Sequence, residues 1–126
     1  MELREVFEAE LMANDILLCR GCEHGRSHKR GFVRFGQAVK VVHLDRAIAT
    51  RSTLHRALHE IGHLVNEVAQ KSMKSWEREE DAEKYATDTM RVLGIRVPRS
   101  VVAAGVSYVA RKKRHGANIR RGRMGR

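Results

Sequence analysis

The sequence predicts a small α+β domain in which helices pack on a short antiparallel β-sheet or hairpin. Its 126 residues leave room for one domain. Apolar residues recur at helical spacing in several long segments, whereas two short runs are rich in β-branched and aromatic residues, as strands are. The chain has one proline and only three Phe, two Tyr and one Trp. That composition favours helices with small, aliphatic packing over a large β-sandwich.

The N-terminal part is expected to start with a helix and to continue into a polar loop. Residues 2–18 have apolar side chains at helical spacing. These are Leu3, Val6, Phe7, Leu11 and Leu18. Residues 19–31 are polar and rich in glycine, so we expect a loop there.

A β-hairpin is predicted next. Residues 32–35 and 38–44 form two β-branched and aromatic runs, with Gly36 and Gln37 between them. Glycine at the first position of a two-residue loop fits a type II′ turn, which connects antiparallel strands. With these two runs, the sheet would have two or three strands.

An amphipathic helix is expected over residues 53–70, with Ser52 or Thr53 as its N-cap. Its apolar residues follow the i, i+3, i+4, i+7 pattern of one helix face. They are Leu54, Ala57, Leu58, Ile61, Leu64, Val65 and Val68. Such a helix turns its apolar stripe towards a core and its opposite face towards water.

Two further helices are predicted in the C-terminal half. A polar connection over residues 71–76 leads to a helix over residues 77–93, which Gly94 and Pro98 would end. A third helix is expected over residues 99–113. The chain contains no internal repeat.

The positive charge is concentrated at the C-terminal end. Of the 25 Lys and Arg residues, eight lie in residues 111–126, which contain no acid. Residues 1–110 contain the other 17 bases and 15 acids. The net charge of +10 is therefore +8 in residues 111–126 and +2 in residues 1–110. We therefore expect a single domain over residues 1–110 and a basic, disordered tail over residues 111–126. The tail could contact nucleic-acid phosphates nonspecifically, or it could be a solvated interaction arm.

No part of the sequence indicates a membrane span or a secretory signal. No run approaches the roughly 20 apolar residues that are needed to cross a bilayer. The N-terminus carries acids where a signal peptide has a basic end. Two cysteines three positions apart, Cys19 and Cys22, do not make a disulfide framework. We therefore expect a cytoplasmic protein without a membrane partner.

The segment His59-Glu60-Ile61-Gly62-His63, in the first amphipathic helix, has the spacing of a zinc site. Two residues four apart on a helix lie within roughly 40° of each other, so both imidazoles can bind one ion. Glu60 follows the first imidazole and can reach a water on the metal without binding the metal itself. Zinc lowers the pKa of such a water to about 7, so Glu60 could act as the catalytic base of a metallopeptidase.

The third metal ligand is expected from the second amphipathic helix. His59 and His63 project from the face opposite the apolar stripe, so another element must cover them. On the second helix, Glu79 lies on the inward stripe. Glu80 and Asp81 point roughly 100° and 160° away from that stripe. Glu79 is therefore the best-placed third ligand, with Glu80 and Asp81 as alternatives.

Other side chains could support such a site. Glu83, one turn after Glu79, could accept a proton from a ligand histidine and fix its tautomer. Tyr85 or Tyr108 could donate a hydrogen bond to the oxyanion of the tetrahedral intermediate, although both have the helical spacing of packing residues. His55 could line the cleft or could be a polar residue at its rim.

Other interpretations stay open at this point. A group of possible sulfur and imidazole ligands lies in the predicted loop. It consists of Cys19, Cys22, His24 and His28. This group could form a second, structural zinc site, or the segment could be a polar loop with two reduced thiols. HExxH patterns also occur by chance on solvated helix faces. A zinc-containing regulatory or nucleic-acid-binding protein without catalytic activity is the alternative to an enzyme.

The motifs resemble those of the ImmA/IrrE family of zinc metallopeptidases, over about residues 30–95. In that family a helix with HExxH is followed by a helix with the pattern E-x-x-A-x-x-F/Y-A. Here the second pattern is Glu79-Glu80-Asp81-Ala82-Glu83-Lys84-Tyr85-Ala86. The resemblance implies a small zincin-like domain with zinc on His59, His63 and Glu79. It also implies that Glu60 is the base and that the substrate is a protein such as a transcriptional repressor.

Overall fold

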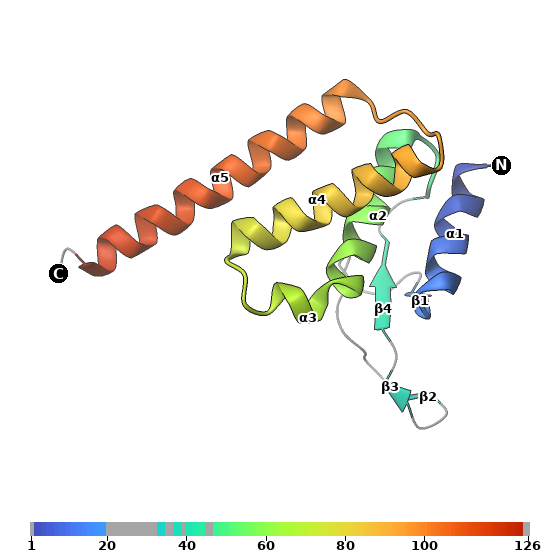
Figure 1. Cartoon of the computed structure of the whole chain (residues 1–126), viewed down its shortest axis with the longest axis horizontal. Helices are drawn as coiled ribbons and strands as arrows, with labels where there is room; N and C mark the ends of the chain where they lie inside the picture. Colours follow the sequence, from blue (N-terminus) through green and yellow to red (C-terminus); the bar gives the residue numbers. More distant parts are fainter. Residues whose placement is uncertain (1, 20–32, 35–36, 39, 45–46, 125–126) are drawn as a thin grey trace.

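The computed structural model describes residues 2–19, 33–34, 37–38, 40–44 and 47–124, with the backbone alone for residues 33–34, 37–38 and 117–124 (Figure 1). Within these residues five helices carry most of the structure. They are α1 (Leu3–Ala13), α2 (Arg51–Val65), α3 (Glu67–Gln70), α4 (Ser75–Val92) and α5 (Arg99–Met124). Four short strands form two separate two-stranded sheets. The predicted helix-rich α+β class is confirmed, but the main sheet differs from the prediction.

The main sheet is parallel, whereas the sequence predicted antiparallel pairing, which is present in the second pair of strands alone among the described residues. Strand β1 (Ile16–Cys19) pairs in parallel with β4 (Lys40–His43). The Lys40 ammonium group donates a hydrogen bond to the Leu64 carbonyl (2.7 Å). Strand β4 is thereby tied to the C-terminal end of α2.

Strand β1 occupies residues that were expected at the end of the first helix. That helix stops earlier, because Asn14 Nδ2 donates to the Glu10 carbonyl (2.9 Å) and Asp15 takes a left-handed conformation (φ 53°). Aspartate tolerates this region better than most residues. The change of direction sends the chain into an extended strand.

Strands β2 (Val33–Arg34) and β3 (Gln37–Ala38) form the second, antiparallel pair. Arg34 lies opposite Gln37, so the chain reverses between them. A hairpin is thus present as predicted, but Gln37 lies in a strand rather than in the turn. Lys40–His43 does not extend this hairpin, because its two valines are buried in the core next to β1.

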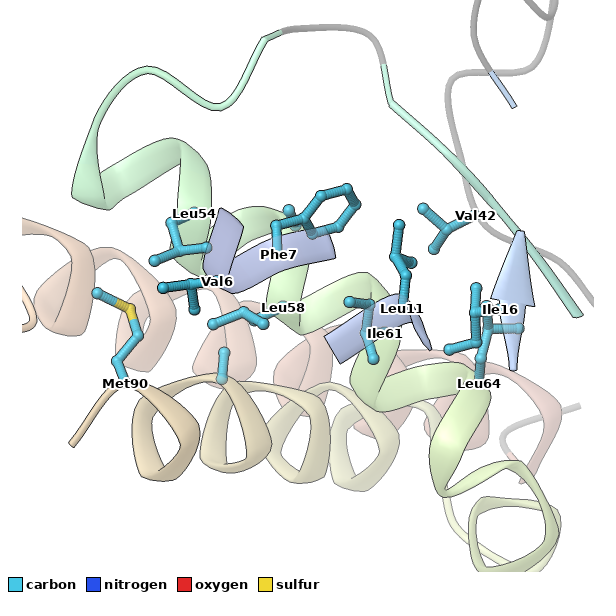
Figure 2. Packing of buried hydrophobic residues seen from close by; sticks show 12 residues of the cluster. Val6, Phe7, Leu11, Ile16, Val42, Leu54, Leu58, Ile61, Leu64 and Met90 are labelled. Carbon is cyan, nitrogen blue, oxygen red and sulfur yellow. The ribbon is translucent and has the colours of Figure 1, made fainter. Parts of the chain in front are cut away.

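The hydrophobic core lies between α1, α2, the parallel sheet and α4 (Figure 2). Helix α2 provides its centre, where Leu54, Leu58 and Ile61 are fully buried. Around them lie Val6, Phe7 and Leu11 of α1, Ile16 of β1, Val42 of β4 and Met90 of α4. Full burial of one such side chain stabilises the fold by roughly 1.5–3 kcal/mol. The apolar stripe predicted for the HExxH helix therefore faces the core.

The start of α2 differs from the prediction. Its N-cap is Thr50, whose Oγ1 accepts a hydrogen bond from the Thr53 backbone N–H (3.1 Å). The Thr53 hydroxyl oxygen in turn accepts from the Thr50 backbone N–H (2.8 Å). This reciprocal capping box places both predicted caps, Ser52 and Thr53, inside the first turn of the helix.

The end of α2 also differs, because the predicted helix over residues 53–70 breaks. Helix α2 stops at Val65, and Asn66 separates it from the short α3. Val68, predicted on the apolar stripe, is consequently 76% exposed, whereas Gln70 is buried.

Small residues let α2 and α4 approach closely. Ala82 and Ala86 of α4 are fully buried. Gly62 of α2 faces the Tyr85 side chain, and a Cβ on Gly62 would lie only 3.0 Å from the Tyr85 Cβ. The close packing of the HExxH helix on the following helix is therefore confirmed.

Helix α4 ends at the predicted glycine. Gly94 has a left-handed conformation (φ 74°). The Ile95 N–H donates to the Met90 carbonyl (2.8 Å) and the Gly94 N–H donates to the Arg91 carbonyl (3.0 Å), which is the Schellman arrangement. After Pro98 the chain returns, so that α5 runs back along α4 (Figure 1).

Helix α5 is longer than predicted. It spans Arg99–Met124, so the backbone of residues 111–124 is helical where a disordered tail was expected. The composition gives a physical reason, because residues 111–124 contain no proline and include seven Lys and Arg, which are good helix formers. The division of the chain after residue 110 stays a prediction.

Candidate metal centre

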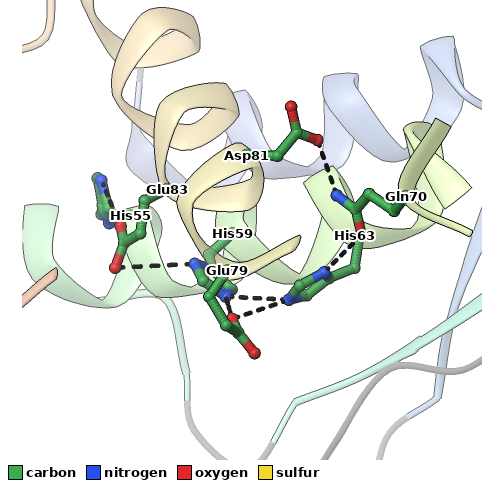
Figure 3. A network of polar contacts seen from close by, with 7 residues as sticks. All are labelled: His55, His59, His63, Gln70, Glu79, Asp81 and Glu83. Carbon is green, nitrogen blue, oxygen red and sulfur yellow. Dashed lines mark hydrogen bonds and ion pairs between the residues drawn. The ribbon is translucent and has the colours of Figure 1, made fainter. Parts of the chain in front are cut away.

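Two histidines of α2 and one glutamate of α4 meet at a common point (Figure 3). The Nε2 atoms of His59 and His63 lie 3.1 Å apart. Glu79 Oε2 lies 2.9 Å from His59 Nε2 and 3.1 Å from His63 Nε2. All three side chains are partly buried. The structure thus brings together the three residues that the sequence selected as ligands, and they could hold a metal ion.

The spacing of the three atoms fits a tetrahedral metal site. Zinc binds imidazole nitrogen and carboxylate oxygen at about 2.0–2.2 Å. The edges of a tetrahedron with ligands at about 2.0 Å are about 3.3 Å long. The three atoms would therefore need to separate by only a few tenths of an ångström. Three protein ligands would leave the fourth corner for water or substrate.

The local electrostatics favour a positive charge at this point. Burial of the His59 ring opposes its charged form, but the hydrogen bond to Glu79 and the negative charges of Glu79 and Glu83 outweigh burial and raise the pKa of His59 to about 9. Burial also opposes the charged form of His63, and hydrogen bonds to Glu79 and Gln70 raise its pKa nonetheless. Burial acts against the charge of Glu79, yet the two histidines lower the pKa of Glu79. A metal cation would take the place of the protons held here.

A hydrogen-bonded network holds the far side of the His63 ring (Figure 3). His63 Nδ1 lies 3.0 Å from Gln70 Oε1. Gln70 Nε2 and Asn66 Nδ2 donate to the same oxygen, Asp81 Oδ2, at 2.8 and 2.9 Å. Because the Gln70 carbonyl oxygen can only accept, His63 donates from Nδ1 and keeps the Nε2 lone pair for a metal.

Sequence reasoning missed this network. Gln70 was expected within a continuous helix, and only the break at Asn66 turns it inwards. The one available signal was Asn66 itself, since asparagine is common at helix ends. Asp81, an alternative third ligand in the sequence, instead accepts hydrogen bonds from Gln70 and Asn66. Glu80, the other alternative, is exposed and lies outside the cluster.

Glu83 lies between His55 and His59. Its Oε1 is 3.8 Å from His59 Nδ1, which is an ion-pair distance and too long for a hydrogen bond. His55 Nε2 lies 3.5 Å from Glu83 Oε2 and 3.0 Å from Thr87 Oγ1. His55 is buried and lines the cavity described next, so of its two interpretations the structure supports a residue that lines the cleft rather than a polar residue at its rim. Burial lowers the pKa of His55, despite the charge of Glu83.

A cavity of about 540 Å³ opens beside the cluster. Its lining includes Arg56 and Glu60 of α2, Glu79 of α4, and Tyr108 and Arg111 of α5. Glu60 follows His59 on the helix and borders this cavity, while the three-residue cluster does not include it. A molecule in the cavity would therefore touch both the cluster and Glu60.

The two candidate oxyanion donors differ in position. Tyr108 lines the cavity. The Tyr85 hydroxyl donates to Glu10 Oε2 (2.7 Å) and so joins α4 to α1. Burial and the Glu10 carboxylate raise the pKa of Tyr85. Tyr85 is thus a packing residue, whereas Tyr108 borders the space in which a substrate would lie.

The possible second zinc site lies mostly outside the described residues. Cys22, His24 and His28 belong to that part of the chain. Cys19 ends strand β1 and is disulfide-bonded. Its interpretation as a reduced thiol is therefore wrong, and its sulfur is not a thiolate ligand in this structure.

Comparisons with known proteins give no match. No family model, no curated protein and no solved structure matches the chain. Among the helices that the structure describes, none has the length and apolar character of a membrane span. The function therefore rests on the geometry of the cluster and the cavity.

Proposed function

We propose that the chain is a zinc-dependent metallopeptidase that hydrolyses a peptide bond in a protein substrate. One observation carries the proposal. Nε2 of His59, Nε2 of His63 and Oε2 of Glu79 converge within 3.1 Å of one another beside a cavity that Glu60 lines. Two imidazoles and one carboxylate are a common ligand set of catalytic zinc sites.

Each residue has a distinct role in the proposed reaction. His59, His63 and Glu79 would hold the ion and leave one position open. When bound, zinc supplies Lewis-acid activation of a water molecule and of the scissile carbonyl. Glu60 takes a proton from the attacking water and delivers it to the leaving amine. Tyr108, which lines the cavity from α5, would donate a hydrogen bond to the oxyanion.

The resemblance to the ImmA/IrrE family supports the same function. Three residues of the family pattern, Glu79, Ala82 and Ala86, lie on the side of α4 that packs on α2, where both alanines are fully buried. Membership of that family is part of the proposal, and it would make the substrate a regulator such as a transcriptional repressor. The expected cytoplasmic location also belongs to the proposal.

Metal content tests the first half of the proposal. Protein purified without added zinc should contain near-stoichiometric zinc, measured by elemental mass spectrometry. His59→Ala should remove the metal, because only two of the three ligands remain. Glu80→Gln, an exposed neighbour of Glu79, is the matched control and should keep it. A wild-type chain that neither carries nor takes up zinc contradicts the proposal.

Proteolysis tests the second half. Candidate host proteins are incubated with the wild type or with Glu60→Gln, and new termini are identified by mass spectrometry. Loss of the general base should slow cleavage by at least about 100-fold, while zinc content and folding stay unchanged. Equal processing by both proteins would exclude Glu60 as the base.

The basic C-terminal segment favours a second function, that of a zinc-containing regulatory or nucleic-acid-binding protein without turnover. Arg111, Lys113 and Arg114 are exposed on α5, and residues 111–126 contain no acid. Such a segment would contact phosphates nonspecifically. In this case Glu60→Gln has no functional effect. Deleting residues 117–126 should weaken DNA binding at moderate salt, and unchanged affinity would argue against nucleic-acid contact.

A further inference from the structure

The cavity beside the cluster has a cationic side chain on each of two walls. Arg56 lies on α2, one turn before Glu60, and Arg111 lies on α5. Both side chains are exposed, and no ion pair joins either guanidinium to another residue in the described part of the chain. Two guanidinium groups without a carboxylate partner at one cavity are suited to an anionic ligand.

Helix α5 brings Arg111 to the level of the metal cluster. A Cβ on Gly105 would lie 2.7 Å from Glu83 Oε1, so these residues are in close contact. Further along, Lys113 Nζ lies 4.7 Å from the centre of the Trp76 ring. The helices are therefore antiparallel, and the turn of α5 between these contacts lies opposite Glu79.

An aromatic contact helps to hold the Arg111 side chain. Its guanidinium carbon lies 5.9 Å from the centre of the Tyr108 ring, within the range of cation–π attraction. Tyr108 lines the same cavity. Arg111 is thus attached to the cavity wall by a contact that leaves its N–H groups available to a ligand.

The charge balance of the cavity depends on the metal. The lining includes three carboxylates, of Glu60, Glu79 and Glu83, against two guanidinium groups. A divalent ion at the cluster would add two positive charges to this lining. An anionic group should therefore enter when the metal is bound, with the arginines as its partners.

We propose that the cavity selects a substrate carboxylate close to the scissile peptide bond, and that Arg56 and Arg111 bind it. This inference rests on the proposed zinc site and names the substrate class for it. Arginine pairs with a carboxylate through two parallel hydrogen bonds, which gives geometric selectivity as well as charge. The carboxylate can belong to an acidic side chain or to the C-terminus of the peptide.

Peptide hydroxamates are suitable probes, because the hydroxamate binds the metal and no turnover is needed. In the first pair the peptide is amidated at its C-terminus and carries either glutamate or glutamine. In the second pair the side chain is alanine and the C-terminus is either free or amidated. Calorimetry with the zinc-loaded full chain should show at least about tenfold tighter binding of the carboxylate member of one pair, the size of one charge-assisted hydrogen bond. The pair that shows the preference identifies the source of the carboxylate.

Variants of the two arginines complete the test. Arg56→Gln and Arg111→Gln should each reduce the preference, with zinc content unchanged. Arg99→Gln, exposed at the start of α5 and outside the cavity lining, should retain it. Equal binding of both members in both pairs overturns the inference and leaves the zinc site standing. A wild-type chain that binds no zinc, or binds zinc but no hydroxamate, refutes the proposed function and this inference with it.

Discussion

Helices α4 and α5 lie side by side, yet they are attached to the molecule in different ways (Figure 1). Helix α4 enters the core with fully buried side chains, among them Ala82 and Met90. Among residues 99–116 of α5, whose burial the structure describes, the one buried residue is Gly105, which has no side chain, and Val106 is 67% exposed. Helix α4 carries Glu79, and α5 carries the outer wall of the cavity. The helix that is packed in the core therefore positions a residue of the candidate metal cluster, whereas a more weakly packed helix provides the outer wall of the cavity.

The largest expected effect tests this difference in packing. Met90→Ala on α4 should lower the free energy of unfolding by roughly 2–5 kcal/mol, because it leaves a cavity in the core. Val106→Ala on α5 should change it by less than about 0.5 kcal/mol. Urea unfolding of the metal-free proteins measures both values. Equal losses would show that α5 is as firmly packed as α4.

The next effect concerns the ligand on α4. Glu79→Gln should weaken zinc binding by more than about 100-fold, which exceeds the usual effect of losing a hydrogen-bond partner of a ligand. Competition with a chromophoric chelator measures the affinity. Glu80→Gln removes the same charge one position further on and should leave the affinity nearly unchanged. A similar loss in both variants would indicate a general charge effect rather than a ligand.

A smaller effect on zinc affinity is expected from the hydrogen-bonded network that holds the His63 ring. Asp81→Ala removes the acceptor that orients Gln70, so His63 is less firmly held and zinc affinity should fall by roughly 10–100-fold. Asp88→Ala is the control, since Asp88 is an exposed aspartate of the same helix that pairs with Lys84 instead. If Asp81→Ala binds zinc as tightly as Asp88→Ala does, the network does not support the site.

The smallest expected effect is a difference in stability between alanine substitutions at two glycines of α5. Gly116→Ala should stabilise the protein by roughly 0.5–1 kcal/mol, because nothing lies within 4 Å of the new methyl group and alanine favours a helix. Gly105→Ala should gain less or nothing, since its Cβ would displace the Glu83 carboxylate. Thermal unfolding of both variants measures the difference. Equal gains would mean that Glu83 moves aside at no cost.

The candidate ligands could be predicted because they lie on two regular helices. The wheel positions of His59, His63 and Glu79 depend only on helical geometry, and small alanines marked the face of α4 that packs on α2. The environment of His63 could not be predicted in the same way. It depends on a helix break at Asn66, where tertiary packing prevails over a continuous apolar pattern.

The sheet was harder to predict than the helices. The runs around Gly36 suggested a single hairpin, because a local sequence pattern indicates pairing only between strands that follow each other in the chain. The pairing of β1 with β4 depends on Asp15, whose left-handed backbone ends α1 and turns Ile16–Cys19 into a strand. The N-cap of α2 was misplaced for a related reason. Thr50 and Thr53 are both good caps, and only their reciprocal hydrogen bonds show which one begins the helix.

The contact between Tyr85 and Glu10 spans 75 positions of the chain, whereas that between His63 and Glu79 spans 16. Contacts between residues that are close in sequence form earlier in folding, because closing a short loop costs less entropy. We therefore expect the segment from α2 to α4 to assemble before the N-terminal helix docks on it. An ion captured at that stage would act as a nucleus, and it would then govern how fast the polypeptide reaches its native state as well as how long it stays there.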